Sequence, residues 1–145
     1  MSDWQRIGQQ RYRIEGDLVL WEGSGLVTRA ELAHLFSECA AVEERYGYAL
    51  LQVDAQTDLG LPPEARRFLA EFHRSHRAIG ATAVSGISPV FVIGVELVLR
   101  AIQLISGKQV PTRFFRARDE ARAWLLEQRP LFRAGTHPMQ LALKV

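Results

Sequence analysis

The chain has 145 residues, of which 48% are hydrophobic and 23% charged, a composition that excludes a disordered chain and fits one globular domain. Its net charge is only +2, but residues 1–60 hold 5 basic and 10 acidic side chains, whereas residues 61–145 hold 13 and 6. Because no nucleic-acid-binding motif accompanies this asymmetry, we expect no nucleic-acid partner. The single cysteine, Cys39, excludes an intramolecular disulfide, and no apolar secretory segment opens the chain, so we expect a cytoplasmic protein.

Regular structure is expected to begin after an N-terminal extension of residues 1–10. Two short strands, 11–15 and 18–22, are joined by the turn-forming pair Gly16-Asp17. Thr28 and Glu31 have the spacing of a capping box and predict the start of a helix, which Gly47 is expected to end. Cys39 falls on the apolar stripe of this helix and is predicted to be a buried, unreactive thiol. That stripe comprises Leu32, Leu35, Phe36, Cys39 and Val42.

The apolar run 48–53 predicts a central strand that is buried on both faces. It is followed by a polar loop and by Pro62-Pro63, where a proline at the first helical position favours a helix start. The carboxyl ends of such strands and the N-termini of helices are common binding sites in α/β sheets. We therefore predict that a partner binds here, through Asp54, Thr57, Asp58, Leu59, Leu61, Glu64 and Arg67.

The chemistry of this region is open between two interpretations. Asp54, Asp58 and Glu64 could together receive a cation or a basic partner, or each could bond its own backbone and complement the helix dipole. His73 and His76 have a spacing compatible with metal binding, but no third ligand is near them in sequence, so we expect them to lie at a helix end. No catalytic constellation, metal site or cofactor is predicted, and we expect a protein that is not an enzyme.

After a strand at 81–84, Ser88-Pro89 predicts a helix that runs to Ser106 and is apolar on nearly all sides. It is too short and too charged to span a membrane. The sheet can cover only one face, so a subunit partner, the C-terminal tail or a lipid-like ligand must cover the rest. We predict a homodimer or ligand face made of Phe91, Val95, Glu96, Val98, Leu99, Arg100 and Ile102.

The last expected elements are a strand at 112–116 and a helix at 120–128, which Arg129-Pro130 should end. Residues 129–145 form a tail whose apolar end is expected to dock on a neighbour, such as the apolar helix. The resulting order, β-β-α-β-α-β-α-β-α, predicts a single-domain α/β protein with a mixed sheet and helices packed against it.

That order, together with PPEARRFLAEF (62–72) and FFRARDEARAWL (114–125), resembles the SpoIIAA-like branch of the STAS superfamily. These bacterial anti-sigma-factor antagonists are related in architecture to CRAL-TRIO lipid-binding domains. The resemblance covers residues 11–128 and implies a regulatory interaction module in which a serine after the central strand is phosphorylated. The comparable stretch here, 58–63, has no serine, and Thr57 is the only hydroxyl in the loop.

Two functions therefore remain open, and a third, weaker possibility is an enzyme whose catalytic residues show no recognisable pattern. The first is a non-catalytic, homodimeric interaction module, and the second is a carrier or sensor of an apolar or lipid-like ligand held between the apolar helix and the sheet. A stable dimer needs a self-complementary patch of roughly 800 Å² per partner. A carrier needs an apolar cavity, typically of about 300–1,000 Å³.

Overall fold

Six strands form one mixed sheet in the centre of the computed structural model, which describes residues 3–76, 79–106 and 111–142. The strands are β1 (Gln5–Ile7), β2 (Gln10–Glu15), β3 (Leu18–Gly23), β4 (Ala49–Ala55), β5 (Gly80–Ser85) and β6 (Thr112–Phe115). The helices are α1 (Arg29–Tyr46), α2 (Pro63–Ser75), α3 (Pro89–Ser106), α4 (Arg118–Arg133) and the short α5 (Pro138–Ala142). The predicted element order is confirmed, and the structure adds β1 before it and α5 after it.

The strands lie in the sheet in the order in which they occur in the chain. β1, β2 and β3 pair antiparallel, whereas β3, β4, β5 and β6 pair parallel, so the predicted mixed sheet is confirmed. The turn between β2 and β3 is Gly16-Asp17, as expected, and Gly16 has a φ of 61° that favours glycine. Parallel pairing requires the crossover helices α1, α2 and α3 between successive strands.

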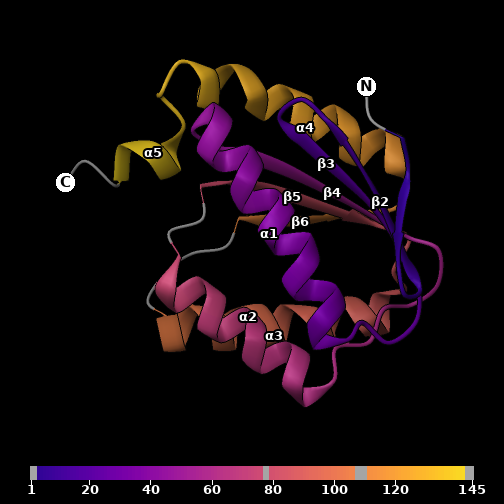
Figure 1. Ribbon diagram of the computed structural model, residues 1–145. Helices are drawn as coiled ribbons and strands as arrows, with labels where there is room; N and C mark the ends of the chain where they lie inside the picture. Colours follow the sequence, from indigo (N-terminus) through magenta and orange to yellow (C-terminus); the bar gives the residue numbers. More distant parts are fainter. Residues whose placement is uncertain (1–2, 77–78, 107–110, 143–145) are drawn as a thin grey trace.

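Helices cover both faces of the sheet (Figure 1). Alternate residues of β4 point to opposite faces: Leu51 and Val53 pack under α1, α2 and α3, whereas Leu50 packs against α4. β4 lies between β3 and β5 and is buried on both faces, which explains its continuous apolar run. The domain therefore has two separate cores: a first core between the sheet and α1, α2 and α3, and a second core between the sheet and α4.

Local sequence signals set the ends of α1. The capping box is formed: the Glu31 amide donates to Thr28 Oγ1 at 3.1 Å, and the Thr28 amide donates to Glu31 Oε1 at 2.8 Å. Glu31 Oε2 also accepts from the Gln9 amide at 2.9 Å, so the buried carboxylate ties the β1–β2 turn to the helix. Gly47 ends the helix with a φ of 86°, as predicted.

The helix end expected at Arg129-Pro130 is wrong, because α4 continues to Arg133. A proline inside a helix removes one backbone hydrogen bond. Here the last turn is held by Phe132, which is buried in the second core, and this burial outweighs the lost bond. The segment predicted as a tail therefore begins inside α4.

The described part of the C-terminal segment docks on α4, and not on the apolar helix α3. The ring of His137 stacks on Phe132 with centroids 3.9 Å apart, and Met139 packs against the second core. The Met139 amide donates to His137 Nδ1 at 3.1 Å, so this nitrogen is an acceptor and the proton sits on Nε2, which faces Gln128 Oε1 at 3.1 Å. A neutral imidazole therefore anchors α5.

Docking of α5 is expected to weaken at acidic pH. Burial lowers the pKa of His137 below its usual value of 6.5. As the pH falls below about 6.5, an undocked segment binds a proton that the docked one resists, so stability present above that pH is progressively lost. The protection factor of the Leu141 amide, which donates to the His137 carbonyl, should fall below this pH. His137→Gln should remove this fall; a wild-type protection factor that shows no more acid sensitivity than that of the variant would contradict the prediction.

Within the described chain, no helix combines the length and the apolar character needed to cross a membrane.

Candidate functional site

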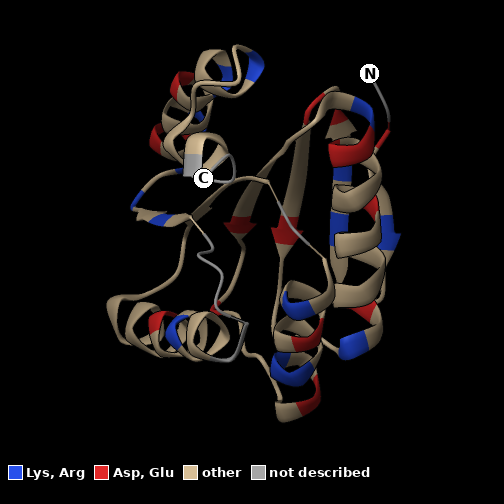
Figure 2. Cartoon of the chain, turned by 90° about the vertical axis from the view of Figure 1, so that its left-hand side faces the viewer, with Lys and Arg blue, Asp and Glu red and all other residues tan. Residues whose placement is uncertain are grey.

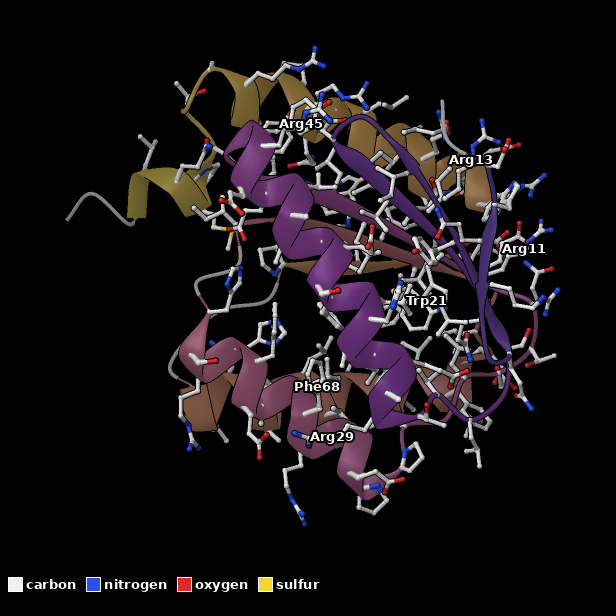
Figure 3. The ribbon with its side chains drawn as sticks, in the orientation of Figure 1. Arg11, Arg13, Trp21, Arg29, Arg45 and Phe68 are labelled. Carbon is white, nitrogen blue, oxygen red and sulfur yellow. The ribbon has the colours of Figure 1, made fainter. Side chains whose placement is uncertain are left out.

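A cavity of about 160 Å³ lies between the sheet and the three helices α1, α2 and α3. Figure 3 shows Trp21 pointing from β3 into this layer, with Phe68 of α2 directed toward α1. The walls are almost entirely apolar. The main wall residues are Trp21, Leu51, Val53 and Val84 from the sheet, Phe36 and Cys39 from α1, Leu69 and Phe72 from α2, and Val95, Leu99 and Ile102 from α3.

The cavity exists because β5 presents little side-chain volume beneath the helices. In the β4–β5 register, Gly80 lies beside Ala49, and Thr82 lies beside the larger Leu51. Both β5 residues border the cavity. Interiors normally pack at crystal-like density, so small residues at this point leave space that the facing helices do not fill.

The polar side chains Glu43, His73 and His76 at the edge of the cavity have hydrogen-bond partners within the chain. Glu43 Oε1 accepts from the Ile79 amide at 2.6 Å, and Glu43 Oε2 lies 2.6 Å from His76 Nε2. The buried His73 directs Nδ1 to the Leu69 carbonyl at 2.8 Å, within its own helix. His76 ends α2, as predicted, and no group of three or more metal-ligating side chains occurs among the described residues.

Cys39 is part of the apolar wall. Burial raises the pKa of its thiol to about 12, and the nearby carboxylates of Glu38 and Glu43 add to the shift. A thiol with so high a pKa stays protonated at physiological pH and is a poor nucleophile. Cys39 thus lies on the predicted apolar stripe of α1, but the residue is half-buried and not fully buried as predicted.

The acidic residues predicted to form a partner site are engaged separately within the chain. Asp58 accepts from the Ser88 amide at 2.9 Å and from its hydroxyl at 3.2 Å, so it holds the start of α3 and not of α2. Asp54 lies 3.7 Å from the guanidinium of Arg118, on the other side of the sheet. Glu64 is exposed in the first turn of α2. The three carboxylates therefore do not gather at one point.

The other predicted partner residues lie in different environments. Leu59 and Leu61 border the cavity, and Leu59 is buried. Thr57 Oγ1 accepts from the Gly25 amide at 2.9 Å, whereas Arg67 is exposed on α2. The loop after β4 thus closes one end of the cavity and links it to the start of α3.

The residues predicted as a dimer or ligand face of α3 divide into two sets. Val95, Leu99 and Ile102 line the cavity, and the half-buried Val98 packs against the first core. The remaining three, Phe91, Glu96 and Arg100, are exposed. One helix therefore contributes its inner face to the cavity and leaves its outer face open.

A second, more polar cavity of about 140 Å³ lies where β3 and β4 end beside the N-terminus of α4. Trp4, Asp54, Arg118 and Gln52 border it. Gln52 is buried, and its Oε1 has no hydrogen-bond partner in the described part of the chain. Sequence reasoning missed this residue, because a glutamine in an apolar run carries no signal of its tertiary surroundings.

The charge asymmetry along the sequence is partly neutralised in the fold. Figure 2 shows acidic and basic segments interspersed along the helices. Four ion pairs join an acidic residue of one half to an arginine of the other, among them Asp17–Arg129 at 2.8 Å and Glu71–Arg29 at 3.0 Å. The two halves of the sequence interleave in the fold, and this weakens the argument for an anionic partner.

Comparisons with models of protein families, with curated proteins and with solved structures give no match for this chain. The functional argument therefore rests on the residues and on the geometry described above.

Proposed function

We propose that this protein binds a small, uncharged apolar molecule in the cavity beneath α1, α2 and α3, and acts as its carrier or sensor. The observation that supports this proposal is the apolar lining of the cavity. A dry apolar cavity of about 150 Å³ accommodates benzene. The present cavity is of similar size, which favours a single aromatic ring or a short branched chain over the lipid-like ligand expected from the sequence.

The state of the polar edge groups supports an uncharged ligand. Glu43 already accepts from the Ile79 amide and pairs with His76, and His73 bonds its own helix. A charged ligand would lose its hydration without gaining a free partner, which costs several kcal/mol or more. An apolar ligand has no comparable cost of dehydration, and it gains contacts with the wall residues of a cavity that is otherwise unfilled.

We further propose that the chain is a non-catalytic, cytoplasmic STAS-type module in which ligand occupancy takes the place of serine phosphorylation. The mixed sheet and the order of its elements support this reading of the resemblance. The loop that carries the phosphorylated serine in that family has no serine here, and Thr57 receives a backbone hydrogen bond. The same loop borders the cavity through Leu59 and Leu61, so a ligand would contact it directly.

Toluene is expected to bind in the cavity and benzoate is not. Toluene should shift the methyl NMR signals of wall residues such as Leu51 and Val84, and at tenfold its Kd it should raise the free energy of unfolding by about 1.4 kcal/mol. Val95→Trp fills the cavity from α3 and should abolish both effects. The matched control Gln103→Trp adds the same side chain on the exposed side of α3 and should bind like the wild type.

The absence of saturable toluene binding by the wild-type protein would refute the proposed function. Unchanged binding by a folded Val95→Trp variant would place the ligand elsewhere. Equal affinity for benzoate and toluene would contradict the proposal that the ligand is uncharged.

A further inference from the structure

The outer face of α3 carries a stripe of exposed aliphatic side chains. Val90, Ile93, Leu97 and Leu104 are 76%, 62%, 59% and 86% exposed, respectively; we call these four residues the outer stripe. At 3.6 residues per turn they fall within one narrow sector, opposite the three α3 residues that line the cavity. Val90, Leu97 and Leu104 are seven residues apart, a spacing typical of helices that pair with another helix.

Two possible occupants of the outer stripe are disfavoured. The described part of the C-terminal segment packs on α4, at the other side of the sheet. A lipid surface is favoured by basic residues on the polar side of an apolar helix. The charged residues described on α3 are one acid, Glu96, and one base, Arg100, so this helix offers no net attraction to anionic lipids.

We propose that the outer stripe binds the outer stripe of a second copy of this chain, with the two α3 helices antiparallel about a two-fold axis at Leu97. This register places Leu97 beside its own copy and Val90 beside Leu104 of the second copy. It also places Ile93 level with the small, exposed Ala101.

The charges beside the outer stripe complement each other in this register. Glu96 and Arg100 are exposed, lie on the same side of the stripe, and form no ion pair with another described residue. A two-fold axis perpendicular to antiparallel helices keeps that side shared by both copies. Glu96 of each copy then lies within about one helical turn of Arg100 of the other, which gives two reciprocal pairs. The interface is independent of what the cavity binds, because the two use opposite faces of α3.

Sedimentation velocity over a range of protein concentrations tests this interface. The wild-type protein should be a dimer in the micromolar range, and Leu97→Asp should weaken the dimer roughly 30-fold or more, as expected for the centre of an interface. Leu126→Asp makes the same change at an exposed leucine of α4 and should leave the dimer intact. A monomeric wild-type protein, or a dimer insensitive to Leu97→Asp, would overturn the proposal.

Charge reversal distinguishes this register from nonspecific apolar association. Glu96→Arg alone and Arg100→Glu alone each place four like charges on one side of the seam, two from each copy, and should weaken self-association at least about tenfold. An equimolar mixture of the two variants should form heterodimers with near wild-type affinity. If the mixture associates no better than either variant alone, the antiparallel register is wrong.

Discussion

Replacing Asp17 by alanine is expected to lower the free energy of unfolding by about 3–5 kcal/mol, which is the usual cost of removing one partner from a buried ion pair. The Asp17 carboxylate is 3% exposed and accepts from Arg129 Nε at 3.0 Å and Nη2 at 2.8 Å. The Tyr48 hydroxyl also donates to it. Without Asp17, the Arg129 guanidinium and the Tyr48 hydroxyl lose their common acceptor in a largely buried site. Chemical denaturation monitored by circular dichroism measures the loss.

The exposed pair Arg29–Glu71 provides the matched control. Its N–O distance of 3.0 Å is nearly the same, but both side chains are about half exposed. Glu71→Ala should therefore change stability by no more than about 1 kcal/mol. Equal effects of the two substitutions would show that burial of Asp17 does not set its contribution.

The same cluster predicts a loss of stability at alkaline pH. Burial and the hydrogen bond to Asp17 raise the pKa of Tyr48 above its usual value of 10. Above about pH 10 the unfolded chain releases the tyrosine proton that the folded chain retains, so the stability present below this pH falls as the pH rises. Tyr48→Phe should reduce this alkaline dependence.

Gly86→Ala is expected to lower the free energy of unfolding by roughly 2–4 kcal/mol. Gly86 joins β5 to the segment that opens α3 and has a φ of 87°, which disfavours any residue with a Cβ. A Cβ at this position would also lie 2.3 Å from the backbone oxygen of Ala55. Because that atom belongs to β4, the chain before α3 would have to move away from the sheet. Toluene binding should weaken together with stability.

Gly47→Ala separates the cost of the positive φ from the cost of the contact with Ala55. Gly47 has nearly the same φ, 86°, but a Cβ there meets nothing within 4 Å. Its cost should be limited to the backbone term of about 1–2 kcal/mol, with toluene binding unchanged. If both substitutions cost the same, the contact with Ala55 contributes nothing.

The sequence predicted many of the residues of the candidate site, but it did not predict how they are arranged around the cavity. The apolar pattern of α3 predicted that one face packs on the sheet and that the rest of the helix contacts a partner or a ligand. The predicted dimer or ligand face includes Val95, Leu99 and Ile102. The pattern could not distinguish these cavity-lining residues from the exposed residues of α3, because a helix that is apolar on all sides has no periodic signal that marks its buried face. Val98 is an example: the predicted dimer or ligand face groups it with Glu96 and Arg100, which are exposed, whereas Val98 is half-buried against the first core.

The loop after β4 shows the same limit for polar residues. Asp54 and Asp58 are four residues apart, and one of the two interpretations of the sequence has them act together. The turn between them directs Asp54 toward α4 and Asp58 toward Ser88 of the next crossover. Hydrogen-bond partners 30 or more residues away are decided by how the crossovers pack, which local sequence does not encode.

The sequence by itself determined the nine elements from β2 to α4 and their order, because these depend on local chemistry: the Thr28–Glu31 capping box, the turn at Gly16-Asp17 and the apolar run of β4. Only the tertiary structure decided that Pro130 lies inside a helix and that the C-terminal segment docks on α4. It alone also decided that a cavity remains where Gly80 and Thr82 lie under the helices. Each of these outcomes depends on the side-chain volumes and contacts of segments that are far apart in the chain. These contacts form only when the helices and the sheet pack together.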